Sequence, residues 1–434
     1  MRTLKKPDMK NYISIILLCI PLLFSAGSIA QFTNKGAQIT IKIGATLYSK
    51  QGFQNSTGGI VTNNGTIVSD SFITNNTGCT FSGNGTYKLQ GNWKNSGTYT
   101  TGKSRLIFFG KGNSDMTSGG ASIYDLQLSK NSNGILNMLD AAKVLDTIQF
   151  LASKNWVQLN KTTLTLDSNC KITGYDETKY FITNDSGFVK KINVGNKKFT
   201  FPVGFNKSTY NPLSITEAGT ADNYSVRCLQ HAFLNGGSGN AIAHGGIDVS
   251  WLVKEGVVGG MNATIEAQWY PANGDQLTGF DSSKCMVVRY TGGAWDYNAG
   301  AAGLASGTTA KTRKRTGVTG VGYFTVLSTA NPTLQEIITA VNSENISGNI
   351  SDARISVYPT IVKNSINISV LRNDDDAEAM NVIITDANGK IVLQKQKMSF
   401  QSQRMWLPNL TPGMYFILIE YGRNTYKQNI MVSE

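Results

Sequence analysis

The sequence holds few of the residues that enzymes and metal sites most often use. It has two histidines and five cysteines among 434 residues, and only 16% of its residues are charged. The histidines, His231 and His244, lie in a glycine-rich stretch without a recognisable set of further ligands. A zinc site or a nucleophile–histidine pair needs such a third partner at a defined geometry. We therefore expect no catalytic residue, no metal and no cofactor.

Proline is scarce, with nine residues, whereas glycine is abundant, with 45. Together with frequent Asn, Thr and Ser, this composition favours strands and turns over helices. Beyond the N-terminal region no apolar run is long enough to cross a bilayer as a helix. A chain of this length can form two or three domains with cores of their own. The sequence thus predicts an all-β protein of several domains.

The N-terminus has the pattern of a cleaved signal peptide (1–30). Basic residues precede an apolar run at 13–24, which is too short to span a membrane in the mature protein. Small residues at Ser28 and Ala30 predict cleavage between Ala30 and Gln31. The formal charge is +12, and losing four basic residues and Asp8 with this segment leaves +9. A basic surface can favour anionic polysaccharide, although solubility alone also explains it; we predict no nucleic-acid partner.

Residues 31–200 contain an irregular repeat that predicts a β-solenoid. Asn64-Gly65-Thr66 recurs twenty residues later as Asn84-Gly85-Thr86, and Asn95-Ser96-Gly97-Thr98 reads as a looser third copy. Asn and Gly tolerate left-handed backbone and suit the corners of a stacked coil. The stretch 136–145 also fits helical periodicity, but we interpret it as strand.

Two motifs in this region have a catalytic alternative. Residues 97–104 match the phosphate-loop pattern, but a strand-like run follows where a helix would have to begin. Parallel coils can also be polysaccharide-active enzymes, which need carboxylates or an arginine projecting from adjacent rungs. The acidic residues are scattered without a pair at rung spacing, so solvated turn positions are the better interpretation: Asp140, Asp146, Asp167, Asp176 and Glu177.

Residues 201–330 predict an antiparallel β-sandwich, because alternate residues from Ala263 to Trp269 are apolar. Trp295 and its neighbouring tyrosines could stack on sugar or belong to the core. The basic run 311–315 could bind an acidic glycan or form a solvated hairpin. Four cysteines remain after cleavage and allow three pairings; Cys228 with Cys285 is the preferred disulfide, with free buried thiols as the alternative.

A linker at 331–353 leads to a tail, 354–434, that predicts a small Ig-like β-sandwich of about seven strands. Short apolar alternations are separated by turn signals such as Asn388-Gly389 and Pro412-Gly413. The run 414–419 is apolar on both faces, which predicts a central strand buried on both sides.

The motifs of the tail resemble the type A C-terminal sorting domain of type IX secretion cargo proteins. The resemblance rests on the order of four short motifs, in which the usual Tyr-Pro-Asn-Pro opening is degraded after Pro359. The motif residues are Tyr358, Pro359, Gly389, Lys390, Gly413, Tyr415 and Lys427. The central part also resembles the extracellular regions of such cargo, through Phe201-Pro202-Val203-Gly204.

This resemblance implies export across the outer membrane of a two-membrane bacterium, with the secretion machinery as the partner of 354–434. It also implies that the tail is cut off during surface attachment. The chain is then expected to be a non-enzymatic cell-surface or secreted protein, such as an adhesin that contacts glycan. The alternatives are a polysaccharide-active β-helix enzyme and a structural subunit of a surface layer.

Overall fold

The computed structural model describes residues 31–131, 133–297, 301–328, 353–358, 361–362, 365–372, 380–386, 390–398, 403–407, 410–421 and 424–433. The predicted signal peptide with Ala30, residues 331–352 of the predicted linker, and the motif residues Pro359 and Gly389 lie outside this set. Across the described residues the secondary structure is strands and a 3₁₀ turn, η2 (Pro271–Asn273). The prediction of an all-β chain is confirmed. None of the described helical segments has the length and apolar character needed to span a bilayer.

Contacts divide the chain into two compact units. The first contains residues 31–232, 247–276 and 282–328, which we call the body. The second contains residues 233–246, 277–281 and 353–433, and we call its residues 353–433 the tail.

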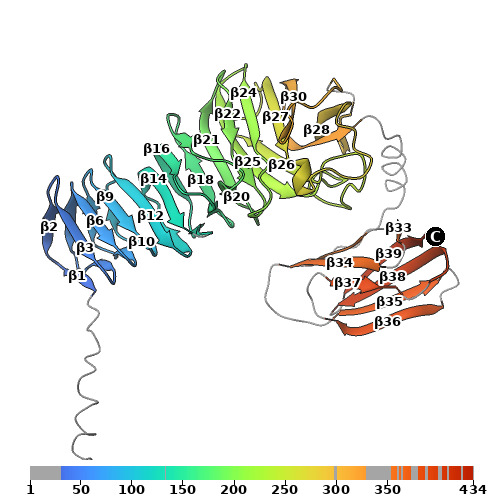
Figure 1. Cartoon of the computed structure of the whole chain (residues 1–434), viewed down its shortest axis with the longest axis horizontal. Helices are drawn as coiled ribbons and strands as arrows, with labels where there is room; N and C mark the ends of the chain where they lie inside the picture. The colour runs from blue at the N-terminus through green and yellow to red at the C-terminus, as the bar shows by residue number, and fades with distance from the viewer. Residues whose placement is uncertain are drawn as a thin grey trace, which may run out of the picture. The chain divides into compact units, whose positions relative to one another are not determined.

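The body begins as a parallel β-solenoid of about eight turns, as predicted, and its rungs follow one another from blue to green in Figure 1. Three parallel sheets run along it. The first sheet has nine strands: β1 (Phe32–Lys35), β4 (Phe53–Ser56), β7 (Ile73–Asn75), β10 (Trp93–Asn95), β13 (Ser114–Thr117), β15 (Ile135–Met138), β17 (Asn155–Gln158), β20 (Lys179–Ile182) and β23 (Val203–Gly204). The second has four: β2 (Gln38–Ile41), β5 (Ile60–Asn63), β8 (Thr80–Ser82) and β11 (Thr98–Tyr99).

The third sheet joins the solenoid to the antiparallel part of the body. Its parallel strands are β3 (Thr46–Ser49), β6 (Thr66–Ser69), β9 (Thr86–Leu89), β12 (Arg105–Lys111), β14 (Ser122–Asn131), β16 (Ala142–Phe150), β18 (Thr163–Leu166) and β21 (Phe188–Val194), with β19 (Lys171–Thr173) beside β16. Strand β25 (Asp222–Gln230) then pairs antiparallel with β21. The sheet continues through β26 (Val249–Glu255), β31 (Gly322–Ser328), β28 (Cys285–Thr291) and β29 (Ala294–Trp295).

A fourth sheet of the body is antiparallel, in the order β22 (Phe199–Phe201), β24 (Leu213–Glu217), β27 (Ala263–Trp269) and β30 (Lys311–Val318). Its alternating strand β27 buries Ala263, Ile265, Ala267 and Trp269 completely, as the period of two predicts. The segment 136–145 forms parts of β15 and β16, so its interpretation as strand is confirmed.

A column of buried asparagines runs through the early rungs of the solenoid. Asn34, Asn55, Asn75 and Asn95 lie on β1, β4, β7 and β10 and are at most 2% exposed. Each Nδ2 donates to the Oδ1 of the next asparagine, at 2.8, 3.0 and 2.9 Å, and Asn95 donates to the carbonyl of Ser118. Stacked amides of this kind satisfy buried polar groups that no solvent reaches, and they fix the register between rungs.

The asparagine–glycine corners form a column distinct from the buried asparagines. The sequence predicts three copies in this column, and the third assignment, at Asn95-Ser96-Gly97-Thr98, is wrong. Thr66 pairs with Thr86, so the first two copies stack as expected. A Cβ on Gly85 would lie 2.5 Å from the carbonyl oxygen of Gly65, which explains the glycine there. Thr98, however, pairs with Thr80 in the second sheet. The third copy therefore belongs to a different corner, the one that follows the buried asparagines.

The predicted disulfide between Cys228 and Cys285 is not formed. Cys228 is a buried free thiol on β25, and Cys285 is on β28 with its Sγ donating to carbonyl oxygens of Ser282 and Gly303. The sheet order β25-β26-β31-β28 separates the two strands by three steps. At about 4.8 Å a step this is about 14 Å, whereas a disulfide spans Cα atoms at most about 7 Å apart. Two cysteines in one domain do not imply proximity.

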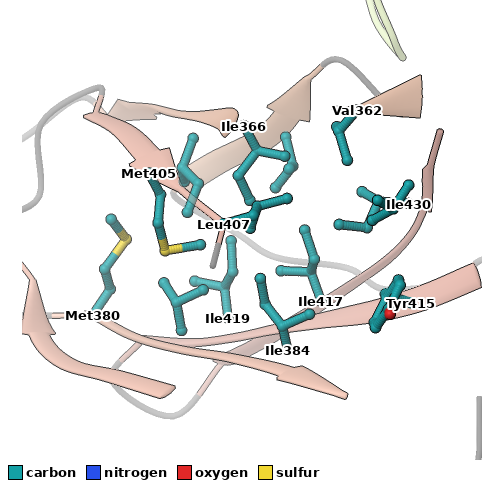
Figure 2. Close-up of a cluster of buried hydrophobic side chains, with 14 residues drawn as sticks. Val362, Ile366, Met380, Ile384, Met405, Leu407, Tyr415, Ile417, Ile419 and Ile430 are labelled. Atoms are coloured by element: carbon teal, nitrogen blue, oxygen red, sulfur yellow. The ribbon is translucent and has the colours of Figure 1, made fainter. Parts of the chain in front are cut away.

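The tail consists of two small sheets. One is antiparallel: β32 (Ala353–Tyr358), β34 (Ser365–Arg372) and β37 (Gln403–Trp406). The other has the order β33 (Ile361–Val362), β39 (Asn424–Val432), β38 (Gly413–Tyr421), β35 (Met380–Asp386) and β36 (Ile391–Met398). Buried side chains from both sheets, among them Ile366, Met405, Ile384 and Ile417, meet in one core (Figure 2). The predicted small C-terminal sandwich is confirmed in its sheets and its core.

Strand β38 corrects another expectation. Tyr415, Ile417 and Ile419 are at most 6% exposed and belong to the core, but Met414 is 47% and Phe416 41% exposed. The prediction that this strand is buried on both sides is therefore wrong. Its sheet is covered on one face, and in the described part of the tail no further layer covers the other.

We expect Asn75→Ala to lower the free energy of unfolding of the body by about 1–3 kcal/mol, because it removes one acceptor of the buried Asn55 amide and the donor to the buried Asn95 Oδ1. Denaturant unfolding of the exported chain measures this. The same change at the adjacent, partly exposed Asn76 is the control. Equal losses in both variants would contradict a special role for the buried column.

Candidate functional site

The sorting-motif residues divide into structural and accessible ones. Tyr415 is buried, and its hydroxyl donates to the carbonyl of Thr411 at 2.9 Å, which fixes the entry into β38. Gly413 is the first residue of that strand. Lys390 closes the β35–β36 hairpin through its backbone N–H, which donates to Asp386 Oδ1 at 2.9 Å. Lys390 itself is exposed.

Two further motif residues lie at the surface. Tyr358 is 45% exposed at the end of β32. Lys427 is exposed on β39, directly opposite Leu418 of β38. The exposed Lys390 and Lys427 are therefore available to a partner, whereas Tyr415 acts within the fold.

The outer face of the third sheet carries an open groove of about 620 Å³ on β9, β12 and β14. Its lining includes Lys88, Gln90, Ile107, Phe109, Lys111, Gln127, Ser129, Asn131 and Leu151. Strand register places Lys88, Ile107 and Gln127 side by side on adjacent rungs. Lys88 Nζ lies 4.8 Å from the centre of the Phe109 ring, a cation–π arrangement. The lining thus combines two lysines with amides and an aromatic ring, and it contains no carboxylate.

A carboxyl pair lies beside this groove. Asp125 on β14 pairs with Arg105 at 3.3 Å, and its other oxygen, Oδ1, is buried with no hydrogen-bond partner. The register between β14 and β16 shifts next to Asp125, at a bulge that includes Asp146. Burial raises the pKa of Asp125, and the adjacent Asp146 carboxyl raises it further, against the opposing effect of Arg105.

The sequence pattern does not predict that Asp125 and Asp146 lie close together. Asp146 is one of the scattered acidic residues, and Asp125 lies inside the apolar run of β14, where a carboxylate at a surface site is not expected. The two residues are 21 positions apart, close to the rung spacing. Only the bulge brings Asp146 next to Asp125, and a bulge is not readable from one sequence.

The other candidates are structural. Trp295 is buried and packs edge-to-face on Tyr290, which is partly exposed, so the core interpretation holds for Trp295. The basic run 311–315 lies within β30, where Arg315 makes two 2.8 Å contacts with Asp296. Residues 97–104 contain β11 and lead into β12, so the phosphate-loop pattern is a coincidence.

The two histidines contact different partners. His231 Nδ1 lies 2.7 Å from Asp248 Oδ1, and His244 lies in the segment 233–246, where it bridges to Thr278. Over the residues that the structure describes, no three His, Cys, Asp or Glu side chains are grouped so as to hold a metal ion.

Comparison with known proteins identifies one part of the chain. Residues 356–433 match the family described as "secretion system C-terminal sorting domain". No curated protein matches the chain. Among solved structures, a β-glucuronidase from Faecalibacterium prausnitzii is similar at 11% identity; the match covers 50% of this chain and 38% of that one. Its TM-score of 0.15 is too low to support an argument about fold or function.

The carboxyl pair gives a testable pH dependence. A carboxyl group whose pKa is higher in the folded state than in the unfolded state destabilises the fold above the unfolded pKa, and this cost disappears as the pH falls below both values. We therefore expect Asp125→Asn to raise the melting temperature at pH 7, since the amide brings no charge into the buried position. The gain should shrink towards pH 3. A melting temperature lowered at pH 7 would contradict a destabilising effect of the buried charge, and Asp115→Asn on the first sheet is the matched control.

Proposed function

We propose that this chain, a type IX secretion cargo protein that ends in a sorting domain, is a non-enzymatic cell-surface or secreted protein whose solenoid binds an anionic glycan. The family match at residues 356–433 provides the export route. The proposal that the solenoid binds an anionic glycan rests on the groove on β9, β12 and β14, because its lining suits a charged sugar chain.

The groove offers the contacts that an acidic sugar needs. The ammonium groups of Lys88 and Lys111 can pair with carboxylate or sulfate groups, and the Gln127 side chain adds an amide to the same groove. The Phe109 ring provides an apolar surface for a sugar face. Because the rungs repeat along one axis, an extended polymer can lie across several strands at once.

The charge of the whole protein supports an anionic ligand. The chain without residues 1–30 has a formal charge of +9. A net positive charge raises the local concentration of polyanions and speeds their association. We propose that this segment is removed between Ala30 and Gln31 after the inner membrane is crossed.

The polysaccharide-active alternative finds less support in the carboxyl pair. Retaining glycosidases hold their two carboxyl groups about 5–5.5 Å apart, and inverting ones about 6.5–9.5 Å. The Asp125 carboxyl is instead 9% exposed and paired with Arg105, so it is not presented to a bound sugar as either arrangement requires. A non-enzymatic role therefore remains the proposal.

We expect the double variant Lys88→Ala, Lys111→Ala to weaken retention on an immobilised polyuronate such as alginate. Exposed charge pairs contribute on the order of 0.5–1 kcal/mol each, so the apparent Kd should rise about 5- to 30-fold, and added salt should weaken binding by the unmodified chain.

The control is the double variant Lys94→Ala, Lys42→Ala, which removes the same charge from exposed positions outside the groove. Equal loss in both variants would mean that only net charge matters. Glycan binding that survives the groove variant unchanged would rule out this groove.

The sorting role has its own test. A chain that ends at residue 352 is expected to accumulate in the periplasm, because it lacks the residues that the sorting family matches. Fractionation of cells and medium measures this, with the full chain as the reference. Normal appearance of the truncated chain outside the cell would contradict export through the tail.

A further inference from the structure

One face of the tail's larger sheet carries apolar side chains that the tail does not cover. Met414 and Phe416 of β38, Met431 of β39 and Ile391 of β36 are 41–53% exposed. Their core-facing neighbours Tyr415, Ile417 and Ile419 point into the buried cluster between the two sheets (Figure 2). Residues alternate between the two faces of a strand, so the exposed residues lie on the opposite face.

Strand register joins these side chains into one patch. Met414 lies opposite Met431, and Phe416 lies opposite Thr385 of β35. Thr385 is in turn opposite Ile391. Directly opposed residues lie about 5 Å apart on the same face. We call the surface formed by Met414, Phe416, Met431 and Ile391 the outer patch.

The outer patch has a basic border formed by motif residues. Lys427 lies opposite Leu418, two positions along β38 from Phe416 and on the same face. Lys390 is exposed immediately before Ile391. Lys390 and Lys427, two residues of the sorting motif, therefore border the outer patch, whereas the buried motif residue Tyr415 is not part of it.

We propose that the outer patch is the surface by which the tail docks onto the type IX secretion machinery of the outer membrane, and that the docking partner presents apolar side chains rimmed by carboxylates. The proposal rests on the sorting role of the tail and is independent of glycan binding by the solenoid.

Three observations support the secretion machinery as the partner that covers the outer patch. Exposed apolar patches rimmed by polar residues mark interaction sites. The tail has a partner by virtue of its family, and the accessible motif lysines border this patch. The opposite sheet offers less, because its exposed Tyr358 and Trp406 lie on β32 and β37 with β34 between them. The Arg404 guanidinium also covers Trp406 on one side, 4.7 Å from the ring centre.

The test replaces Phe416 and Met431 by threonine in the full chain. Threonine keeps strand propensity, so the fold should persist while the apolar contact is lost. We expect the exported fraction to fall at least fivefold, with accumulation in the periplasm and an unchanged melting temperature. The matched control is Trp406→Thr, which removes a 61% exposed aromatic residue from the other sheet and should be exported normally.

A photo-reactive residue at position 416 of the otherwise unmodified chain avoids any effect on folding. Cross-linking to an outer-membrane component of the type IX machinery is the expected result. Wild-type export of the double variant would overturn the proposal, as would cross-links found only to a second copy of the chain. Alginate retention of the exported fraction reports on the solenoid separately, so the two proposals can fail independently.

Discussion

Hydrogen bonds between buried asparagine side chains determine how the rungs of the solenoid stack. Asn55, Asn75 and Asn95 each donate to the next rung and accept from the previous one, and Asn34 begins the column as a donor. Asn55 also donates to the corner carbonyl of Gly59. A shift of one residue in any rung would break two of these bonds inside a core without solvent. The column therefore imposes a step of 20 or 21 residues on the early rungs.

This fixed step has consequences on the outside of the coil. Because inward positions are held in register, outward positions also form straight rows, such as the row that places Lys88, Ile107 and Gln127 on consecutive rungs. A groove built from such rows follows the axis of the coil and suits a polymer better than a small compact ligand. Where the step changes, at the bulge beside Asp125, side chains from neighbouring rungs meet at closer range.

The tail is organised by a different principle. Its two sheets share one core, and the strand apolar on both faces, β38, has only one of those faces covered within the described tail. In an isolated domain such exposure costs solubility, so a partner that covers the open face offers a physical reason for it. The sorting motif fits this division, because Tyr415 stabilises the fold from within whereas Lys390 and Lys427 border the open face.

The sequence by itself determined the strand-rich class, the stacked corners at Asn64 and Asn84, and the sorting tail, because alternation and turn chemistry are local properties of the chain. Tertiary structure alone decided which residues meet across rungs and sheets. It placed Cys228 and Cys285 on strands that are three steps apart in one sheet. It also placed the third asparagine–glycine copy at another corner and brought Asp125 beside Asp146. It also left one side of β38 uncovered. The sequence does not predict this, because an apolar residue in a strand reads the same whether it packs in the core of its own domain or against another protein.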